Sequence, residues 1–116
     1  MNIEEFRAYC LSKNGVTEET PFGPDTLVLK VSGKMFAAAG IELFERFNVK
    51  CDPIVAMELR EKFDAVEPGW HMNKTHWNTI YVNRDLGDKQ LKHWINHSYD
   101  LVVSKLPKSK RDQLKK

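Results

Sequence analysis

Apolar residues at the start of the chain recur with a helical period. Ile3, Phe6 and Cys10 fall on one face of a predicted first helix, and Asn2 is its expected N-cap. Asn14-Gly15 is expected to end this helix, because glycine tolerates the left-handed backbone of a helix C-terminus. Residues 20–25, "TPFGPD", carry two prolines and a glycine, which is typical of an ordered turn.

The period then changes to that of strands. Residues 26–31 and 34–39 are short apolar runs separated by Ser32-Gly33, a spacing that fits a two-residue hairpin. Residues 47–51 alternate between apolar and polar side chains, as a half-buried strand does. The three runs predict an antiparallel meander. The pattern leaves open whether residues 40–46 extend a strand or form an irregular connection.

Helical periods return in the second half of the chain. Asp52-Pro53 predicts a helix start, since proline is tolerated in the first turn. The expected buried stripe of this helix has a spacing of four: Val55, Leu59 and Phe63. Residues 77–82 alternate as a further strand. Asp88 is the expected cap of a long helix to about residue 105, and Pro107 starts a short basic helix or tail.

These elements predict one α+β domain over residues 1–116. Their order is α-β-β-β-α-β-α with a short C-terminal helix, and we expect an antiparallel sheet with helices packed on one face. Apolar residues make up 41% and charged residues 29%, which is typical of globular proteins. The acidic first residues do not fit a secretory signal, and no apolar run is long enough for a membrane span. We expect a cytoplasmic protein without membrane attachment.

Charge is distributed unevenly along the chain. Residues 1–88 carry ten Lys/Arg and fourteen Asp/Glu, whereas residues 89–116 carry eight and two. The basic C-terminal end is suited to a polyanionic partner, but a run of solvated lysines is also common in proteins without such a partner. Charge alone leaves both explanations open.

Candidate chemistry is sparse. Cys10 and Cys51 show no disulfide or zinc pattern and are expected to be buried. His71 and His76 lack neighbouring ligands for a metal, and we interpret the pair His93/His97 as a solvated helix face. The chain also lacks a glycine-rich phosphate loop. We therefore assign no catalytic residue, metal or cofactor.

Residues 68–78, "PGWHMNKTHWN", contain the densest set of potential contact residues. A tryptophan can stack on a base or sugar, and lysine, histidine and asparagine can bind phosphate. Alternatively, these side chains only satisfy and anchor a turn. We expect Met72, His76 and Trp77 to be structural. The candidate nucleic-acid-binding residues are Trp70, His71, Asn73, Lys74, Lys30, Lys34, Lys108, Lys110 and Arg111.

Several segments resemble the MmcQ/YjbR family of small bacterial proteins. The similar segments are "PFGPDTLVLKVSGKMFA" (21–37), "VKCDP" (49–53), "LREKF" (59–63), "PGWHMNKTHWNT" (68–79) and "SYDLVVSKLPK" (98–108). The central family signature matches at Pro68, Gly69, His71, Met72, Asn73, Lys74, His76 and Trp77. Trp70 departs from it, since many relatives carry another aromatic residue there. The resemblance implies a YjbR-like fold, grouped with secretion-chaperone-like or CyaY-like architectures, and a DNA-binding function.

The leading hypothesis is therefore weak DNA binding directed mainly at backbone phosphates. It requires that the basic C-terminal end and Lys74 lie on one surface. The first alternative is a protein-binding, chaperone-like module without a nucleic-acid role. The second is a small-ligand binder or enzyme at the loop from His71 to Trp77.

Overall fold

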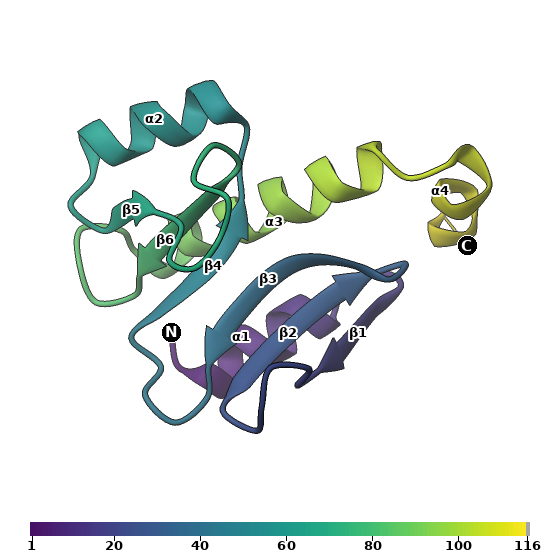
Figure 1. Cartoon of the computed structure of the whole chain (residues 1–116), viewed down its shortest axis with the longest axis horizontal. Coiled ribbons are helices and arrows are strands. Elements are labelled where there is room, and N and C mark those ends of the chain that lie inside the picture. Colours follow the sequence, from purple (N-terminus) through teal and green to yellow (C-terminus); the bar gives the residue numbers. More distant parts are fainter. Residues whose placement is uncertain (116) are drawn as a thin grey trace.

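The computed structural model describes residues 1–115, and within them the chain forms four helices and six strands (Figure 1). In chain order these are α1 (Ile3–Leu11), β1 (Val16–Glu19), β2 (Thr26–Val31), β3 (Lys34–Gly40), β4 (Arg46–Lys50), α2 (Pro53–Lys62), β5 (Val66–Pro68), β6 (Trp77–Tyr81), α3 (Asp88–Ser104) and α4 (Lys108–Leu114).

The strands form one antiparallel sheet in the order β1-β2-β3-β4-β6-β5. This confirms the predicted α+β class and the meander of β2, β3 and β4. The predicted element order was incomplete, because it lacked the two edge strands β1 and β5. β1 is a short edge strand with three exposed residues, and β5 has only three residues and ends in Pro68. Neither has the alternation of apolar residues that marks a half-buried strand.

The connections around β3 follow from local backbone conformation. Ser32 and Gly33 have φ values of 49° and 79°, so both central residues of the β2–β3 hairpin are left-handed, as in a type I′ turn. β3 continues to Gly40, and an irregular connection leads to β4, which begins at Arg46. The structure thus decides the path of residues 40–46.

Helix boundaries correct three predictions. α2 ends at Lys62 with Phe63 as its C-cap, so Phe63 is not part of the predicted helical stripe. The capping box of Asn2 and Glu5 is present, but α1 ends at Leu11 with Ser12 as C-cap, before the predicted Asn14-Gly15. α3 begins at Asp88, and Gly87 is its N-cap instead of Asp88. Local sequence signals locate a helix end only to within one or two residues, because tertiary packing also determines where the backbone hydrogen bonds of the helix stop.

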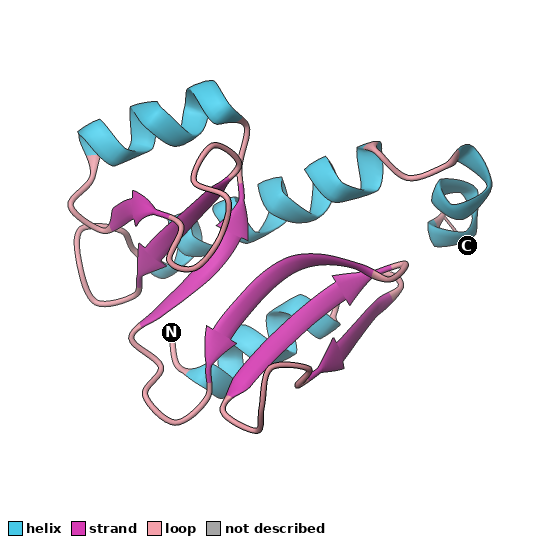
Figure 2. Cartoon of the chain, in the orientation of Figure 1, coloured by secondary structure: helices cyan, strands magenta, loops and turns pink. Residues whose placement is uncertain are grey.

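The helices cover one face of the sheet, as predicted, and the other face carries none (Figures 1 and 2). α1 and α3 pack against the strands, while α2 contacts β5 and β6. The largest fully buried apolar side chains lie between these layers: Phe6, Leu29, Phe36, Phe47, Ile80, Leu91 and Ile95. We call the face without helices the open face.

A buried serine of α3 joins β3 to β4. The two strands pair directly only from Ala37 to Ala39. Beyond this segment, the Lys50 amide donates to Ser98 Oγ at 2.8 Å, and Ser98 Oγ donates to the Phe36 carbonyl at 2.5 Å. The hydroxyl therefore replaces a missing strand-to-strand hydrogen bond beneath the middle of the sheet.

Candidate binding site on the open face of the sheet

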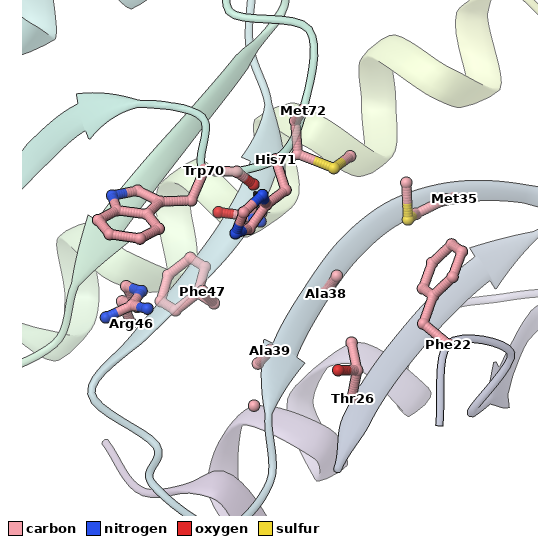
Figure 3. Close-up of a pocket in the computed structure, with 12 residues that line it drawn as sticks. Phe22, Thr26, Met35, Ala38, Ala39, Arg46, Phe47, Trp70, His71 and Met72 are labelled. Carbon is pink, nitrogen blue, oxygen red and sulfur yellow. Dashed lines mark hydrogen bonds between the residues drawn. The ribbon is translucent and has the colours of Figure 1, made fainter. Parts of the chain in front are cut away.

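The open face carries a pocket of about 460 Å³. Figure 3 shows Trp70, His71 and Met72 on one side of it, and Met35 and Phe22 on the other. β3 and β4 form the floor, and the turn before β2 supplies Phe22. The lining residues are Phe22, Thr26, Met35, Ala38, Ala39, Gly40, Arg46, Phe47, Asn48, Trp70, His71 and Met72.

Trp70 is held in place through its backbone. Its amide donates to Thr79 Oγ1 at 2.8 Å, and its carbonyl accepts from Asn48 Nδ2 at 3.2 Å. Thr79 Oγ1 in turn donates to Asn48 Oδ1 at 2.6 Å. These two side chains, on the neighbouring strands β6 and β4, satisfy both backbone groups of Trp70 and leave 45% of the residue exposed.

Residues 69–76, which we call the pocket loop, fold tightly over β6. Gly69 N–H donates to the Trp77 carbonyl at 2.9 Å. A Cβ atom on Gly69 would lie 2.8 Å from the Trp77 Cβ, so this close approach requires glycine. Trp77 is buried, as predicted, but it lies outside the main core cluster, and residues 77–80 are all buried instead of alternating.

Two candidate contact residues take part in the internal bonding of the pocket loop. Asn73 Oδ1 accepts from the Thr75 amide at 2.9 Å, and its carbonyl accepts from the Trp77 amide at 3.0 Å. The Lys74 ammonium donates to the Gly69 carbonyl at 3.1 Å. Both side chains therefore have a structural role in addition to any role in binding.

Arg60 of α2 fastens the end of this loop and was missed by the sequence analysis. Its Nε donates to Asn78 Oδ1 at 2.7 Å, and its Nη2 donates to the carbonyls of Lys74 and of Trp77, the latter at 3.1 Å. The segment "LREKF" was noted only for its family resemblance. In the sequence Arg60 resembles any solvent-exposed arginine of a helix, and nothing near it indicates a contact with residues 74–78.

Arg46 is the second residue that the sequence analysis missed, and it lines the pocket. Its guanidinium lies over the Trp70 ring, 4.6 Å from the centroid, and 5.8 Å from the Tyr81 centroid. Cation–π attraction of this kind holds the guanidinium near the two rings. Arg46 is the last residue of segment 40–46, for which the hydrophobic pattern did not decide between strand and irregular connection. The sequence therefore could not predict which face of the sheet the Arg46 side chain lies on.

The candidate nucleic-acid-binding residues fall into separate groups. Trp70, His71, Asn73 and Lys74 belong to the pocket loop. Lys30 forms an ion pair with Glu19 at 2.9 Å, and Lys34 is exposed beside the β2–β3 hairpin.

Lys108, Lys110 and Arg111 belong to α4, which Figure 1 shows at one end of the long axis of the molecule, well separated from the pocket loop. Leu114 holds α4 near Gly15, and its carbonyl accepts from Asn14 Nδ2 at 2.8 Å. A second hollow of about 620 Å³ lies between α4 and α3, and Arg111 lines it. The expectation that the basic C-terminal end and Lys74 share one surface is therefore not met.

The cysteines and histidines of the helix-covered side have no part in this pocket. Burial raises the pKa of the Cys10 thiol to about 12 and that of Cys51 to about 11. Desolvation also lowers the pKa of His97, whose Nε2 accepts from the Asp52 amide at 3.2 Å. Among residues 1–115, no three His, Cys, Asp or Glu side chains are grouped as metal ligands. None of the described helices is both long and apolar enough to cross a membrane.

Fold and pocket together define a small antiparallel α+β domain with a ligand-sized pocket on the open face of its sheet. The sequence model of the YjbR family matches residues 11–101, and the chain belongs to this family. The resemblance that the sequence motifs indicated is thus confirmed.

Similar proteins extend over most of the chain. The uncharacterised protein YjbR of Escherichia coli K12 is 32% identical over 115 residues, which cover 98% of both chains. The uncharacterised protein YbdF of Escherichia coli O157:H7 is 36% identical over 94 residues, covering 80% of this chain and 75% of YbdF.

Two solved structures are also similar. The crystal structure of Deinococcus radiodurans DR2400, with the domain DUF419, has a TM-score of 0.91 at 30% identity, covering 98% of this chain and 88% of that one. A crystal structure of a Pseudomonas syringae protein has a TM-score of 0.73 at 29% identity, covering 87% and 98%. The names of these relatives state no ligand, so DNA binding and protein binding both stay predictions.

Proposed function

We propose that this protein is a binding protein that holds a flat, largely apolar group of its ligand in the open-face pocket. The observation that carries the proposal is the pocket itself, about 460 Å³ between the pocket loop and Phe22. Its volume falls within the range of roughly 300–1,000 Å³ in which proteins hold small ligands.

The lining supplies the contacts that such a group needs. Trp70, a residue that is 45% exposed, offers an aromatic side chain, and Phe22, which is 73% exposed, offers another from the opposite side. Met35 and Met72 are adaptable apolar side chains that fit ligands of irregular outline. His71 adds a hydrogen-bonding group beside Trp70, to whose ring its own ring lies edge-on at 5.9 Å.

A magnetic resonance titration with 1-naphthalenemethanol as a neutral aromatic probe tests this function. We expect saturable shifts of amide signals in the pocket loop, β3 and β4. Trp70→Ala should abolish these shifts. Met57→Ala is the matched control, because Met57 is an exposed apolar residue of α2, outside the pocket. Shifts spread evenly over the surface, or unchanged in Trp70→Ala, would refute the proposal.

Single-stranded DNA is a second candidate ligand. Here the main contact would be a base stacked on Trp70, whereas the sequence analysis expected contacts mainly to backbone phosphates. The observation that favours it is the half-exposed residue Trp70 in the lining of the pocket, since an unpaired base can stack on a tryptophan side chain. A continuous track for duplex phosphates has less support, because Lys30 is paired with Glu19 and the α4 cations lie elsewhere.

Fluorescence anisotropy of a labelled oligothymidylate at low and moderate salt tests the second candidate. Binding through the pocket should be lost in Trp70→Ala and retained in the double variant Lys108→Ala/Lys110→Ala. The reverse result would assign the binding to α4. An absence of saturable binding at both salt concentrations would remove DNA as a ligand.

A further inference from the structure

Two arginines lie over the same aromatic ring of the open face, but only one has a carboxylate partner. The Arg84 guanidinium lies 3.7 Å from the Tyr81 centroid, and its Nη1 is 3.5 Å from Glu67 and 3.7 Å from Asp64. Arg46 lies near the same ring at 5.8 Å. Within residues 1–115, Arg46 makes no ion pair and no side-chain hydrogen bond.

The position of Arg46 is nevertheless well defined. Its backbone pairs with Tyr81 across β4 and β6, and its guanidinium lies between the Tyr81 and Trp70 rings. A guanidinium that lies over an aromatic ring keeps N–H groups that can donate hydrogen bonds. Because Arg46 lines the pocket, these donors are available to a ligand that lies there.

We infer that the ligand of the open-face pocket carries an oxyanion, a carboxylate or a phosphate, that pairs with Arg46 while its flat part packs beside Trp70. This inference rests on the proposed function and adds the charge of the ligand to it. A guanidinium matches both oxyanions because it can donate two parallel hydrogen bonds to either. Asn48 is less available for this task, since its Nδ2 and Oδ1 already hold Trp70 and Thr79.

Three probes that share a naphthalene ring separate the contribution of the aromatic group from that of the oxyanion: neutral 1-naphthalenemethanol, 1-naphthoate and 1-naphthyl phosphate. We expect one or both anionic probes to bind about tenfold more tightly than the neutral one, as one charge-assisted hydrogen bond predicts. The carboxylate and phosphate titrations then show which oxyanion the site prefers. Raising the salt concentration should reduce the preference and leave the neutral probe unaffected.

Single substitutions show which residue causes the tighter binding of the anionic probes. Arg46→Gln should abolish it while the neutral probe still binds, and Arg46→Lys should retain part of it. Arg84→Gln is the matched control, since Arg84 lies over Tyr81 and is already paired. His71→Gln should keep the preference, which separates the contribution of Arg46 from that of the neighbouring hydrogen-bonding group His71.

The outcomes distinguish this inference from the proposed function. Equal affinity for neutral and anionic probes, with binding still dependent on Trp70, would overturn the inference and keep the pocket. A preference that survives Arg46→Gln, or that disappears in His71→Gln, would also overturn it. No saturable binding of any probe would refute both.

Discussion

Replacing Ser98 by alanine should destabilise the protein far more than the loss of one hydroxyl suggests. Ser98 is fully buried, and its Oγ bonds both the Phe36 carbonyl and the Lys50 amide. Ser98→Ala leaves both backbone groups without a partner. Each unsatisfied buried group costs about 1–3 kcal/mol, so we expect the loss of both partners to lower the free energy of unfolding by about 2–6 kcal/mol. That is a large part of the roughly 5–15 kcal/mol typical of a domain.

Urea unfolding followed by circular dichroism measures the loss, and hydrogen exchange at the Lys50 amide locates it. Ser104→Ala is the matched control, because Ser104 lies on the same helix and its hydroxyl donates to the Leu101 carbonyl at an exposed position. We expect the control to stay within about 0.5 kcal/mol of the wild type. Equal stability of the two variants would refute the assignment of Ser98 as the link between β3 and β4.

Three further predictions concern the pocket loop and α2. Trp77→Ala should lower the free energy of unfolding by about 3–5 kcal/mol in urea, because Trp77 is buried. Lys74→Ala, which loses one part-buried hydrogen bond to a carbonyl, should cost only about 1 kcal/mol, and similar midpoints would contradict this division. Gly69→Ala should destabilise by about 1–3 kcal/mol and weaken probe binding, because its Cβ would meet Trp77, and a neutral result would show that the loop can shift. Desolvation lowers the pKa of His97 below its ordinary value of 6.5, so the folded state binds this proton less readily than the unfolded state, and stability should fall as the pH drops below about 6.5. His97→Gln should weaken that decline between about pH 7.5 and 5.5, and an unchanged pH profile of urea midpoints would exclude His97 as a contributor.

Most of the fold was predictable because its signals are local. The Ser32-Gly33 hairpin, the alternating β4 and the caps of α1 and α2 each depend on residues close together in the chain. The edge strands β1 and β5 were not predictable in this way. They exist because a neighbouring strand offers hydrogen bonds, and that neighbour becomes available only when the sheet forms.

The candidate site was predictable in part. The unusual composition of residues 68–78 pointed to Trp70 and His71, and both line the pocket. The basic residues of α4 were grouped with them on charge alone, but the course of α3 carries α4 away from the pocket loop. Arg46 was missed, since a single arginine in an irregular segment gives no periodic signal.

The sequence determined which segments become helices and inner strands, because hydrophobic period, caps and turn residues act over a few positions. It also determined that Trp77 and both cysteines are buried. Only the tertiary structure decided that Ser98 joins two strands, that Lys30 is neutralised by Glu19, and that Arg46 lies between two rings without a carboxylate partner among the described residues. These contacts join residues far apart in the chain or on neighbouring strands, and the packing of the sheet sets their distances.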